Sequence, residues 1–514
     1  MTGSTTNYFH FKHALLRYSA LAALVAGLSG ASTAAEITDI GIVDAVKDEL
    51  TYDPAVYSTS VDVSSVDGIV TLSGRVGDIL AKERAVRLAG TIRGVRAIVN
   101  QIEVDPVLDV PPANIERNIE LALQEDAATD DLKIKAKANQ AGFVTLNGTV
   151  DSWAQVNLVE TVAKGVYGVT GVDNRIDFNY TDDRSDEDIK ADVKARMDWN
   201  PLIDAKMVEV DVDDGVVSLD GKVGSVAERS KAVGLAYVAG VSKVNLDDLE
   251  VDEWDDDMRR REGSDIVRSN EEVTNAVNDA LFYDPRVSYF KIDVEADRGE
   301  VTLRGSVDNL AAKRAAGQDA RNTTGVIRVK NRLDVVSPMT GKPENVIAKV
   351  ESALERNPYT YDDDITAAMF GGVVRLYGDV DSLYERAEAD RVASRVVGVE
   401  KVVNLIDVRD DNLPLAYDPY LYDFWPNYAW YDRSPITTMK TDAEIADDIE
   451  DQLFWSIAVD SDEVNVSVDN GEATLTGTVD SESERYAAIK NAYDGGAVDV
   501  IDDLEVERVD GSGR

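Results

Sequence analysis

A ten-residue segment with two glycines recurs six times in this chain and limits its fold more than any other feature. The copies end at residues 76, 150, 223, 307, 380 and 479 and read DGIVTLSGRV, AGFVTLNGTV, DGVVSLDGKV, RGEVTLRGSV, GGVVRLYGDV and NGEATLTGTV. Apolar and polar residues alternate along the segment, as in a strand with one buried face and one exposed face. The first glycine lies at the turn before the strand, where a positive φ favours glycine. Six copies in register predict six structural units.

The second glycine of each copy lies on the buried side of the strand, where a side chain is expected. A glycine at this point predicts that another element crosses the strand closely. These structural glycines are Gly74, Gly148, Gly221, Gly305, Gly378 and Gly477.

A helix is predicted before each glycine strand, because apolar residues recur at i, i+4 and i+8 and form one core-facing stripe. The six triplets are Ile42/Val46/Leu50, Ile115/Ile119/Leu123, Ile189/Val193/Met197, Val273/Val277/Leu281, Val346/Val350/Leu354 and Ile445/Ile449/Leu453. In four units a proline soon follows and is expected to end the helix, because proline disfavours helix at the preceding residue. Thr441 and Glu444 have the spacing of a capping box at the start of the last of these helices.

A first strand, a second helix and a third strand complete each predicted unit. In the first unit the second helix is expected over 79–92, with Gly94 as its C-cap, and the third strand over 95–104. The first two strands are close enough in sequence to form a hairpin, and the helical crossover implies a parallel third strand. The predicted fold class is therefore α+β, a tandem array of six small αββαβ units. Each unit is a three-stranded mixed sheet covered by two helices.

This pattern resembles the BON domain, a family named for bacterial osmotically inducible and nodulation proteins. The match is carried by VTLSGRV, by the second helix and by GVRAIVNQIEV at 94–104, and the other five units repeat it. The resemblance implies an αββαβ fold, a periplasmic or envelope location, and roles in osmotic or envelope stress. It also implies binding at phospholipid interfaces in some members, and no catalytic residues or cofactor.

The predicted organisation places two linkers between the units. It comprises a signal peptide at 1–35, units 1 to 6 at 36–110, 111–182, 185–252, 271–338, 339–409 and 441–508, a charged linker at 253–270, an aromatic and proline-rich linker at 410–440, and a tail at 509–514.

The signal peptide is predicted because Lys12 and Arg17 precede an apolar run at 20–28 that is followed by small residues up to Ala35. The run is too short to span a bilayer, and no other run approaches spanning length, so no transmembrane segment is expected in the mature chain. We expect a soluble protein in the periplasm of a Gram-negative bacterium, exported by a cleaved signal peptide. Secretion to the medium is the alternative.

The composition argues against most enzyme classes. The chain has no cysteine, and both histidines, His10 and His13, lie in the predicted signal peptide. The mature chain therefore lacks thiolate nucleophiles, histidine bases and nearly all zinc ligands. Acidic clusters such as 362–364 lack the ligand pattern of a calcium loop. We expect no enzyme activity, no metal and no cofactor, although carboxylate or lysine chemistry stays formally open.

A net charge of −44 is expected to repel nucleic acid and, on average, anionic membranes. Unit 4 differs because its acidic and basic residues nearly balance. Its candidate contact residues are Lys313, Arg314, Arg321, Arg328, Lys330 and Arg332. They form either an ordinary mixed surface or a local cationic face for anionic headgroups or an acidic neighbour.

The aromatic linker adds Trp425, Trp430 and Tyr431 as candidate contact residues. One interpretation is that this segment folds back on a neighbouring unit. The other is that it binds a partner, a glycan or a lipid interface.

Two functions are compatible with these observations. The first is a periplasmic binding protein that maintains the envelope or acts in osmotic stress through association with phospholipid surfaces. The alternative is a periplasmic chaperone or scaffold for envelope proteins.

Overall fold

The computed structural model describes residues 37–506, except 54, 57–60, 107–108, 179–183, 253–267, 288–291, 337–341 and 410–439. The predicted signal peptide, most of the charged linker and the tail at 509–514 lie outside the described residues. So do Trp425, Trp430 and Tyr431 of the aromatic linker.

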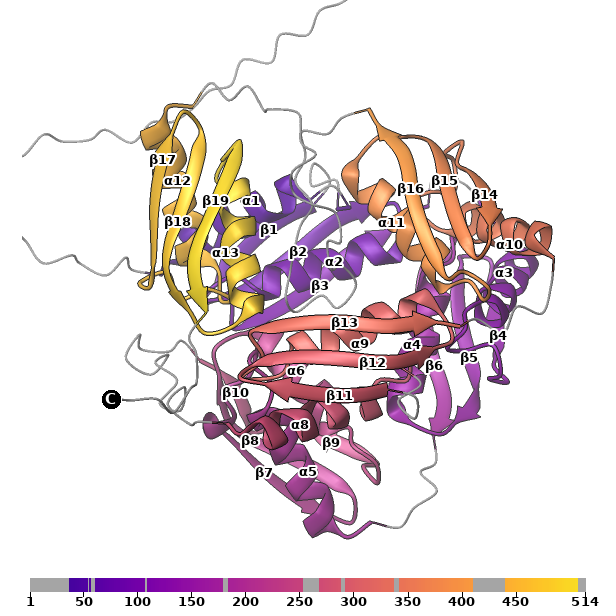
Figure 1. Ribbon diagram of the computed structural model, residues 1–514, viewed down its shortest axis with the longest axis horizontal. Coiled ribbons are helices and arrows are strands. Elements are labelled where there is room, and N and C mark those ends of the chain that lie inside the picture. The colour runs from indigo at the N-terminus through magenta and orange to yellow at the C-terminus, as the bar shows by residue number, and fades with distance from the viewer. Residues whose placement is uncertain are drawn as a thin grey trace, which may run out of the picture. The chain divides into compact units, whose positions relative to one another are not determined.

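The described residues form six successive groups of helices and strands (Figure 1). Unit 1 has α1 (Asp39–Tyr52), β1 (Val61–Val66), β2 (Ile69–Val76), α2 (Ile79–Gly90) and β3 (Ala97–Val104). Unit 2 has α3 (Pro112–Glu125), β4 (Lys135–Ala138), β5 (Phe143–Val150), α4 (Trp153–Lys164) and β6 (Gly171–Phe178). Unit 3 has α5 (Asp186–Asp198), η2 (Ala205–Met207), β7 (Val208–Asp213), β8 (Val216–Val223), α6 (Val226–Ala236), β9 (Lys243–Asn245) and β10 (Leu249–Val251).

The second half of the chain repeats the order. Unit 4 has α8 (Asn270–Tyr283), β11 (Ile292–Asp297), β12 (Glu300–Val307), α9 (Leu310–Arg321) and β13 (Arg328–Val335). Unit 5 has α10 (Pro343–Arg356), β14 (Thr366–Phe370), β15 (Val373–Val380), α11 (Leu383–Arg395) and β16 (Lys401–Val408). Unit 6 has α12 (Asp442–Trp455), β17 (Val464–Asp469), β18 (Glu472–Val479), α13 (Glu482–Asp494) and β19 (Asp499–Val506).

The glycine strand is the middle strand of every sheet. In unit 4, β12 pairs antiparallel with β11 and parallel with β13, and Figure 1 shows these three strands side by side. The other units have the same topology, which confirms the predicted mixed sheet and α+β class. Unit 3 differs in one detail: its third strand is divided into β9 and β10, which both pair with β8.

Each unit has its own hydrophobic core between one face of its sheet and its two helices. In unit 2, Ile119 of α3 packs with Val144 and Leu146 of β5 and with Val159 of α4, and all four side chains are fully buried. The predicted helix triplets are buried in all six units. The opposite face of each sheet therefore has no helix of its own unit to cover it.

The hairpin turn that contains the first glycine is bonded to the start of the first helix. In unit 1, Asp67 and Gly68 both have positive φ, at 52° and 72°, as a type I′ turn requires. The carboxylate of Asp39, in the first turn of α1, accepts hydrogen bonds from the backbone N–H groups of both residues, at 2.9 and 3.0 Å. Asp186 and Asp442 make the same pair of bonds in units 3 and 6.

In units 2, 3, 5 and 6 the second glycine lies where the backbone entering the first strand crosses the glycine strand. In unit 5, Gly378 has a φ of +145°, and a Cβ atom built on it would lie 2.6 Å from the carbonyl oxygen of Asp364. A real Cβ atom does not approach a backbone atom that closely. In unit 2, a Cβ atom on Gly148 would lie 2.7 Å from Cδ1 of Ile134. The element that crosses is thus the start of the hairpin and not a helix.

The glycine expected to cap the second helix has another role. Helix α2 ends at Gly90, four residues before Gly94, which has a φ of +84° in the following turn. A Cβ atom on Gly94 would lie 2.4 Å from Cγ2 of Ile37, just before the first helix, and 3.1 Å from Cδ1 of Ile42 within it, and Gly398 approaches Val346 in a similar way. The C-cap prediction was wrong because this glycine serves the close approach of a turn to the first helix.

An asparagine in the third strand ties that strand to the second helix. In unit 5, Asn404 Nδ2 donates to the carbonyl oxygen of Arg386 in α11 at 2.7 Å. Its Oδ1 accepts from the backbone N–H of Ile406 at 3.2 Å. Asn174 and Asn331 make the same two hydrogen bonds in units 2 and 4, one to a carbonyl oxygen of the second helix and one from a backbone N–H of the third strand. The repeated asparagine therefore fixes the second helix on the sheet.

We predict that Gly378→Ala destabilises unit 5 by about 2–4 kcal/mol, because the methyl group meets backbone that has little room to move and the residue keeps a positive φ. Thermal unfolding followed by circular dichroism of the full chain measures the change. Gly234→Ala in α6 is the matched control, since a Cβ atom there meets nothing within 4 Å. The control is expected to be neutral or stabilising, because alanine favours helix over glycine. Equal melting curves for Gly378→Ala and the wild type would contradict the crossing.

Candidate interaction surfaces

The uncovered faces of the six sheets differ in chemistry. The open face of unit 5 carries Phe370, Tyr377 and Leu405, which are 82%, 41% and 47% exposed. That of unit 4 carries no exposed large apolar side chain within its three strands, and Val336, which follows β13, is exposed. Contiguous exposed apolar side chains mark sites of interaction more often than isolated ones do. Unit 5 therefore offers the clearest candidate surface.

The strand pairing places the apolar side chains of unit 5 next to one another. Phe370 of β14 lies opposite Val373 of β15, and Tyr377 of β15 lies beside Leu405 of β16. Between these two rows, Ala368, Arg375 and Val403 lie across the three strands. Side chains of directly paired residues contact each other across a sheet. We call this set the unit 5 open face: Ala368, Phe370, Val373, Arg375, Tyr377, Lys401, Val403 and Leu405.

Two cations belong to the unit 5 open face. Lys401 is paired with Val373, in the row of Phe370, and Arg375 lies in the next row. Neither forms an ion pair with a carboxylate in the described part of the chain. At the far end of β15 and β16, Asp379 and Asp407 are paired with each other. The open face is therefore apolar and cationic near the hairpin turn and acidic at the opposite end.

The six candidate cations of unit 4 do not form one surface. Lys313, Arg314 and Arg321 lie on α9, whereas Arg328, Lys330 and Arg332 alternate along β13 on the open face of the sheet. Arg314 is ion-paired with Asp390 of α11 in unit 5, and the Asp390 side chain is 4% exposed. Arg314 is thus directed at an acidic residue of unit 5, and the role of these six cations as a contact surface stays a prediction.

The cations on β13 face a carboxylate on the adjacent strand. Lys330 and Arg328 are both ion-paired with Glu300 of β12. The hydrogen bond from Lys330 is the main cause that lowers the pKa of Glu300 below its usual value. These pairs are exposed to solvent and contribute little to stability. The row remains a candidate contact for anions, but part of its charge is already balanced.

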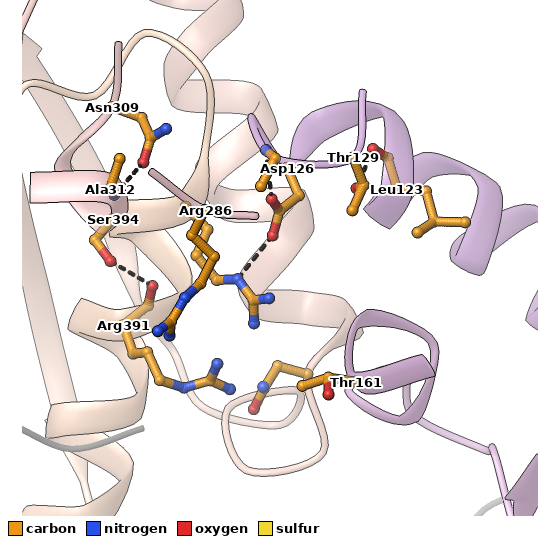
Figure 2. A network of polar contacts seen from close by, with 12 residues as sticks. Leu123, Asp126, Thr129, Thr161, Arg286, Asn309, Ala312, Arg391 and Ser394 are labelled. Carbon is orange, nitrogen blue, oxygen red and sulfur yellow. Dashed lines mark hydrogen bonds and ion pairs between the residues drawn. The ribbon is translucent and has the colours of Figure 1, made fainter. Parts of the chain in front are cut away.

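Contacts between units also bury polar groups. Asp78 is the N-cap of α2, and its Oδ1 accepts from the backbone N–H of Ala81 at 2.8 Å. Burial raises the pKa of Asp78 to about 6, and the charge of Glu388 in unit 5 adds to the shift. In unit 4 the same position is Asn309, whose Oδ1 accepts from Ala312 at 2.7 Å (Figure 2). An uncharged cap therefore fits this position.

No group of histidine, cysteine and carboxylate side chains that could hold a metal ion is found among the described residues. Within the same residues, no helix is both long enough and apolar enough to cross a membrane.

We predict that Asp78→Asn raises the melting midpoint at pH 8 and leaves it unchanged at pH 4. The folded protein favours the neutral carboxyl group, so its contribution to stability is complete below the unfolded pKa near 3.9 and is lost as the pH rises through about 6. Asparagine still accepts the capping hydrogen bond but does not ionise. We therefore expect the free energy of unfolding at pH 8 to rise by about 1–3 kcal/mol. Asp62→Asn, at an exposed position of the same unit, is the control and should show no pH-dependent gain. A gain of equal size at both pH values would argue against the ionisation of Asp78.

Comparisons with known proteins agree with the repeated fold. A family model described as the BON domain matches residues 38–106, 112–180, 185–253, 269–337, 344–410 and 441–508. Osmotically inducible protein Y of Escherichia coli (strain K12) is 32% identical over 140 residues, which are 26% of this chain and 69% of that protein.

Two solved structures of CdsD, a structural protein of the type III secretion system of Chlamydia trachomatis, are 13% identical to this chain with a TM-score of 0.12. They cover 43% and 42% of this chain and 98% and 100% of the solved chains. The family model, by contrast, matches every one of the six repeated units, and the chain belongs to the BON domain family.

Proposed function

We propose that this protein is a periplasmic, non-enzymatic binding protein that associates with anionic phospholipid surfaces and acts in envelope maintenance during osmotic stress. The E. coli relative is named as osmotically inducible, and the leader residues have the pattern of an export signal. The observation that carries the lipid proposal is the unit 5 open face, where exposed apolar side chains lie beside two cations that form no ion pair with a carboxylate among the described residues.

The chemistry of this face suits the boundary between headgroups and acyl chains. Phe370 and Leu405 supply apolar area, and each Å² removed from water contributes about 25 cal/mol. Tyr377 has an apolar ring and a polar hydroxyl group, which favours the interface. Arg375 and Lys401 are placed to meet phosphate groups, and each cation near an anionic surface contributes about 1 kcal/mol. Binding through this face is expected to be weak and reversible.

The arrangement of charge on the face also sets its orientation. Phe370, Val373 and Lys401 lie next to the hairpin turn at Gly371 and Gly372. These two glycines carry no side chains, although the Glu400 carboxylate lies beside Gly372. Asp379 and Asp407 lie at the other end of the strands. We expect the turn to point towards the membrane and the acidic end to face water.

The net charge of −44 does not prevent such a local contact. At 0.1 M salt, charges further than about 10 Å apart are largely screened. The cations of unit 5 therefore act on a nearby membrane with little influence from the acidic units further away. The same screening predicts that added salt weakens the cationic part of the binding.

A second candidate function is a chaperone or scaffold, and the open face of unit 1 favours it. Val66, Ile69 and Val99 are exposed there at 68%, 45% and 42%. Arg75 on the same face is ion-paired with Glu103. An apolar surface whose cation Arg75 is ion-paired fits an apolar segment of an unfolded protein better than an anionic lipid.

Flotation of the full chain with liposomes that contain anionic phospholipid tests the proposal. We predict that the wild type floats at low salt and that Arg375→Gln with Lys401→Gln weakens binding about 10- to 30-fold, since two contributions of about 1 kcal/mol are lost. Lys135→Gln is the matched control, because Lys135 is an exposed lysine on the open face of unit 2. It should bind like the wild type.

A triple substitution of Arg328, Lys330 and Arg332 by glutamine tests the row on β13 in the same assay. A greater loss for this variant than for the unit 5 variant would move the lipid site to unit 4. No flotation at low salt, together with suppression of the aggregation of an unfolded envelope protein, would reject the lipid proposal in favour of the chaperone.

A further inference from the structure

One position at the end of the first helix contacts another unit in units 2 to 6. It lies two residues after the third apolar residue of the helix triplet and is occupied by Glu125, Trp199, Tyr283, Arg356 and Trp455 in units 2 to 6. Trp455 packs against the core of unit 1, Trp199 against that of unit 4, and Tyr283 against that of unit 3. We call it the pairing position.

The backbone at the pairing position is bonded in a repeated way. Its carbonyl oxygen accepts from the N–H of the residue that precedes the turn glycine after the second helix of another unit. The four such bonds are Arg93 to Trp455 at 3.0 Å, Tyr167 to Arg356 at 2.7 Å, Thr324 to Trp199 at 2.8 Å and Val397 to Glu125 at 3.2 Å. They join unit 1 to unit 6, unit 2 to unit 5, and unit 3 to unit 4.

A short antiparallel bridge accompanies these bonds in two of the pairs. Ile92 pairs with Ser456 between units 1 and 6, and Asp126 pairs with Val396 between units 2 and 5. The residues occupy equivalent positions in the repeat. In units 2 and 5 the backbone bond is made in both directions, from Tyr167 and from Val397. The interface between units 2 and 5 is thus isologous, as in a two-fold dimer of similar subunits.

The side chains at the pairing position differ from pair to pair. In units 3 and 4 they are Trp199 and Tyr283, and the Tyr283 hydroxyl group donates to Asp192 of unit 3 at 2.9 Å. In units 2 and 5 they are Glu125 and Arg356, which form an ion pair with side chains only 14% and 7% exposed. In the same interface, Arg395 Nε donates to Asp126 at 2.7 Å, and Figure 2 shows the contacts of Asp126.

The opposite charges select one partner and reject others. Two copies of unit 2 paired in this way would place Glu125 against Glu125, and two copies of unit 5 would place Arg356 against Arg356. An aromatic partner would leave either charge buried without an ion pair. Each of these arrangements is costly in a desolvated interface.

Every pair joins one unit from 37–252 to one unit from 268–506. The two halves of the chain are therefore complementary, unit by unit, and 253–267 is the covalent link between them. We infer that the pairing position is the recognition site by which units of this chain select each other, and that the two halves bind each other without the link. The partner that this surface fits is another BON unit with the complementary side chain.

Cleavage of the folded full chain at a protease site inserted into 253–267 tests the inference. The two halves are expected to co-elute in size-exclusion chromatography at about 1 μM and physiological salt. Glu125→Arg and Arg356→Glu are each expected to weaken this association at least about tenfold, because a buried charge then faces a like charge. The double variant Glu125→Arg with Arg356→Glu is expected to restore it to within about threefold, because the ion pair is rebuilt with its direction reversed.

Glu120→Arg is the matched control, because Glu120 lies on the same helix as Glu125 but is exposed. It should leave the association unchanged. Separation of the wild-type halves after cleavage would overturn the inference, as would a double variant no better than the single ones. If the single variants fail to fold, recovery of the folded, associated protein in the double variant still supports it, and failure to recover overturns it.

Discussion

Units 2, 3, 5 and 6 depend on the contact between their glycine strand and the backbone that enters the hairpin. The carbonyl oxygen of Asp364 lies where a side chain on Gly378 would be, so the two strands approach more closely there than side chains allow. This approach sets the register in which Leu376 and Val374 meet the first helix. A side chain at Gly378 would force these two segments apart and disturb that register. A unit of this size has a small hydrophobic core, so a shift of this register would remove a large part of its stability.

Much of the fold followed from the sequence because local signals agreed with the tertiary structure. The buried faces of strand and helix were predicted from the alternation of Val70, Leu72 and Val76 and from the helix triplets, and all of these side chains are buried. The predicted capping box at Thr441 and Glu444 is also present. The role of Gly94 was missed because a glycine after a helix has the same local signature in a C-cap as in a turn that packs on a distant helix. The distinction depends on Ile42, which is more than 50 positions earlier in the chain.

The candidate surfaces were harder to predict, since they depend on which residues share a face and on which units touch. Charge counting pointed to unit 4, but Arg314 is turned towards Asp390 of unit 5. The unit 5 open face was not predicted because its apolar residues lie at solvent-facing strand positions, which are usually polar, and because they come from three separate strands. A search for apolar residues at the solvent-facing positions of each strand would have found Phe370, Tyr377 and Leu405. The partner of Glu125 could not have been found in this way, because no local sequence feature of Arg356 indicates a contact with a residue 231 positions away.

The order of the pairs has a consequence for the way the chain comes together. Units 3 and 4 are adjacent in sequence, so their contact closes a short loop, whereas the contact of Arg93 with Trp455 closes one that contains most of the protein. Closing a longer loop costs more conformational entropy and is slower. Loop-closure entropy therefore favours assembly outward from the middle of the chain, with units 1 and 6 joined last. During synthesis, unit 1 is complete long before unit 6 exists, and its surface for Trp455 stays exposed to water until the last unit has folded.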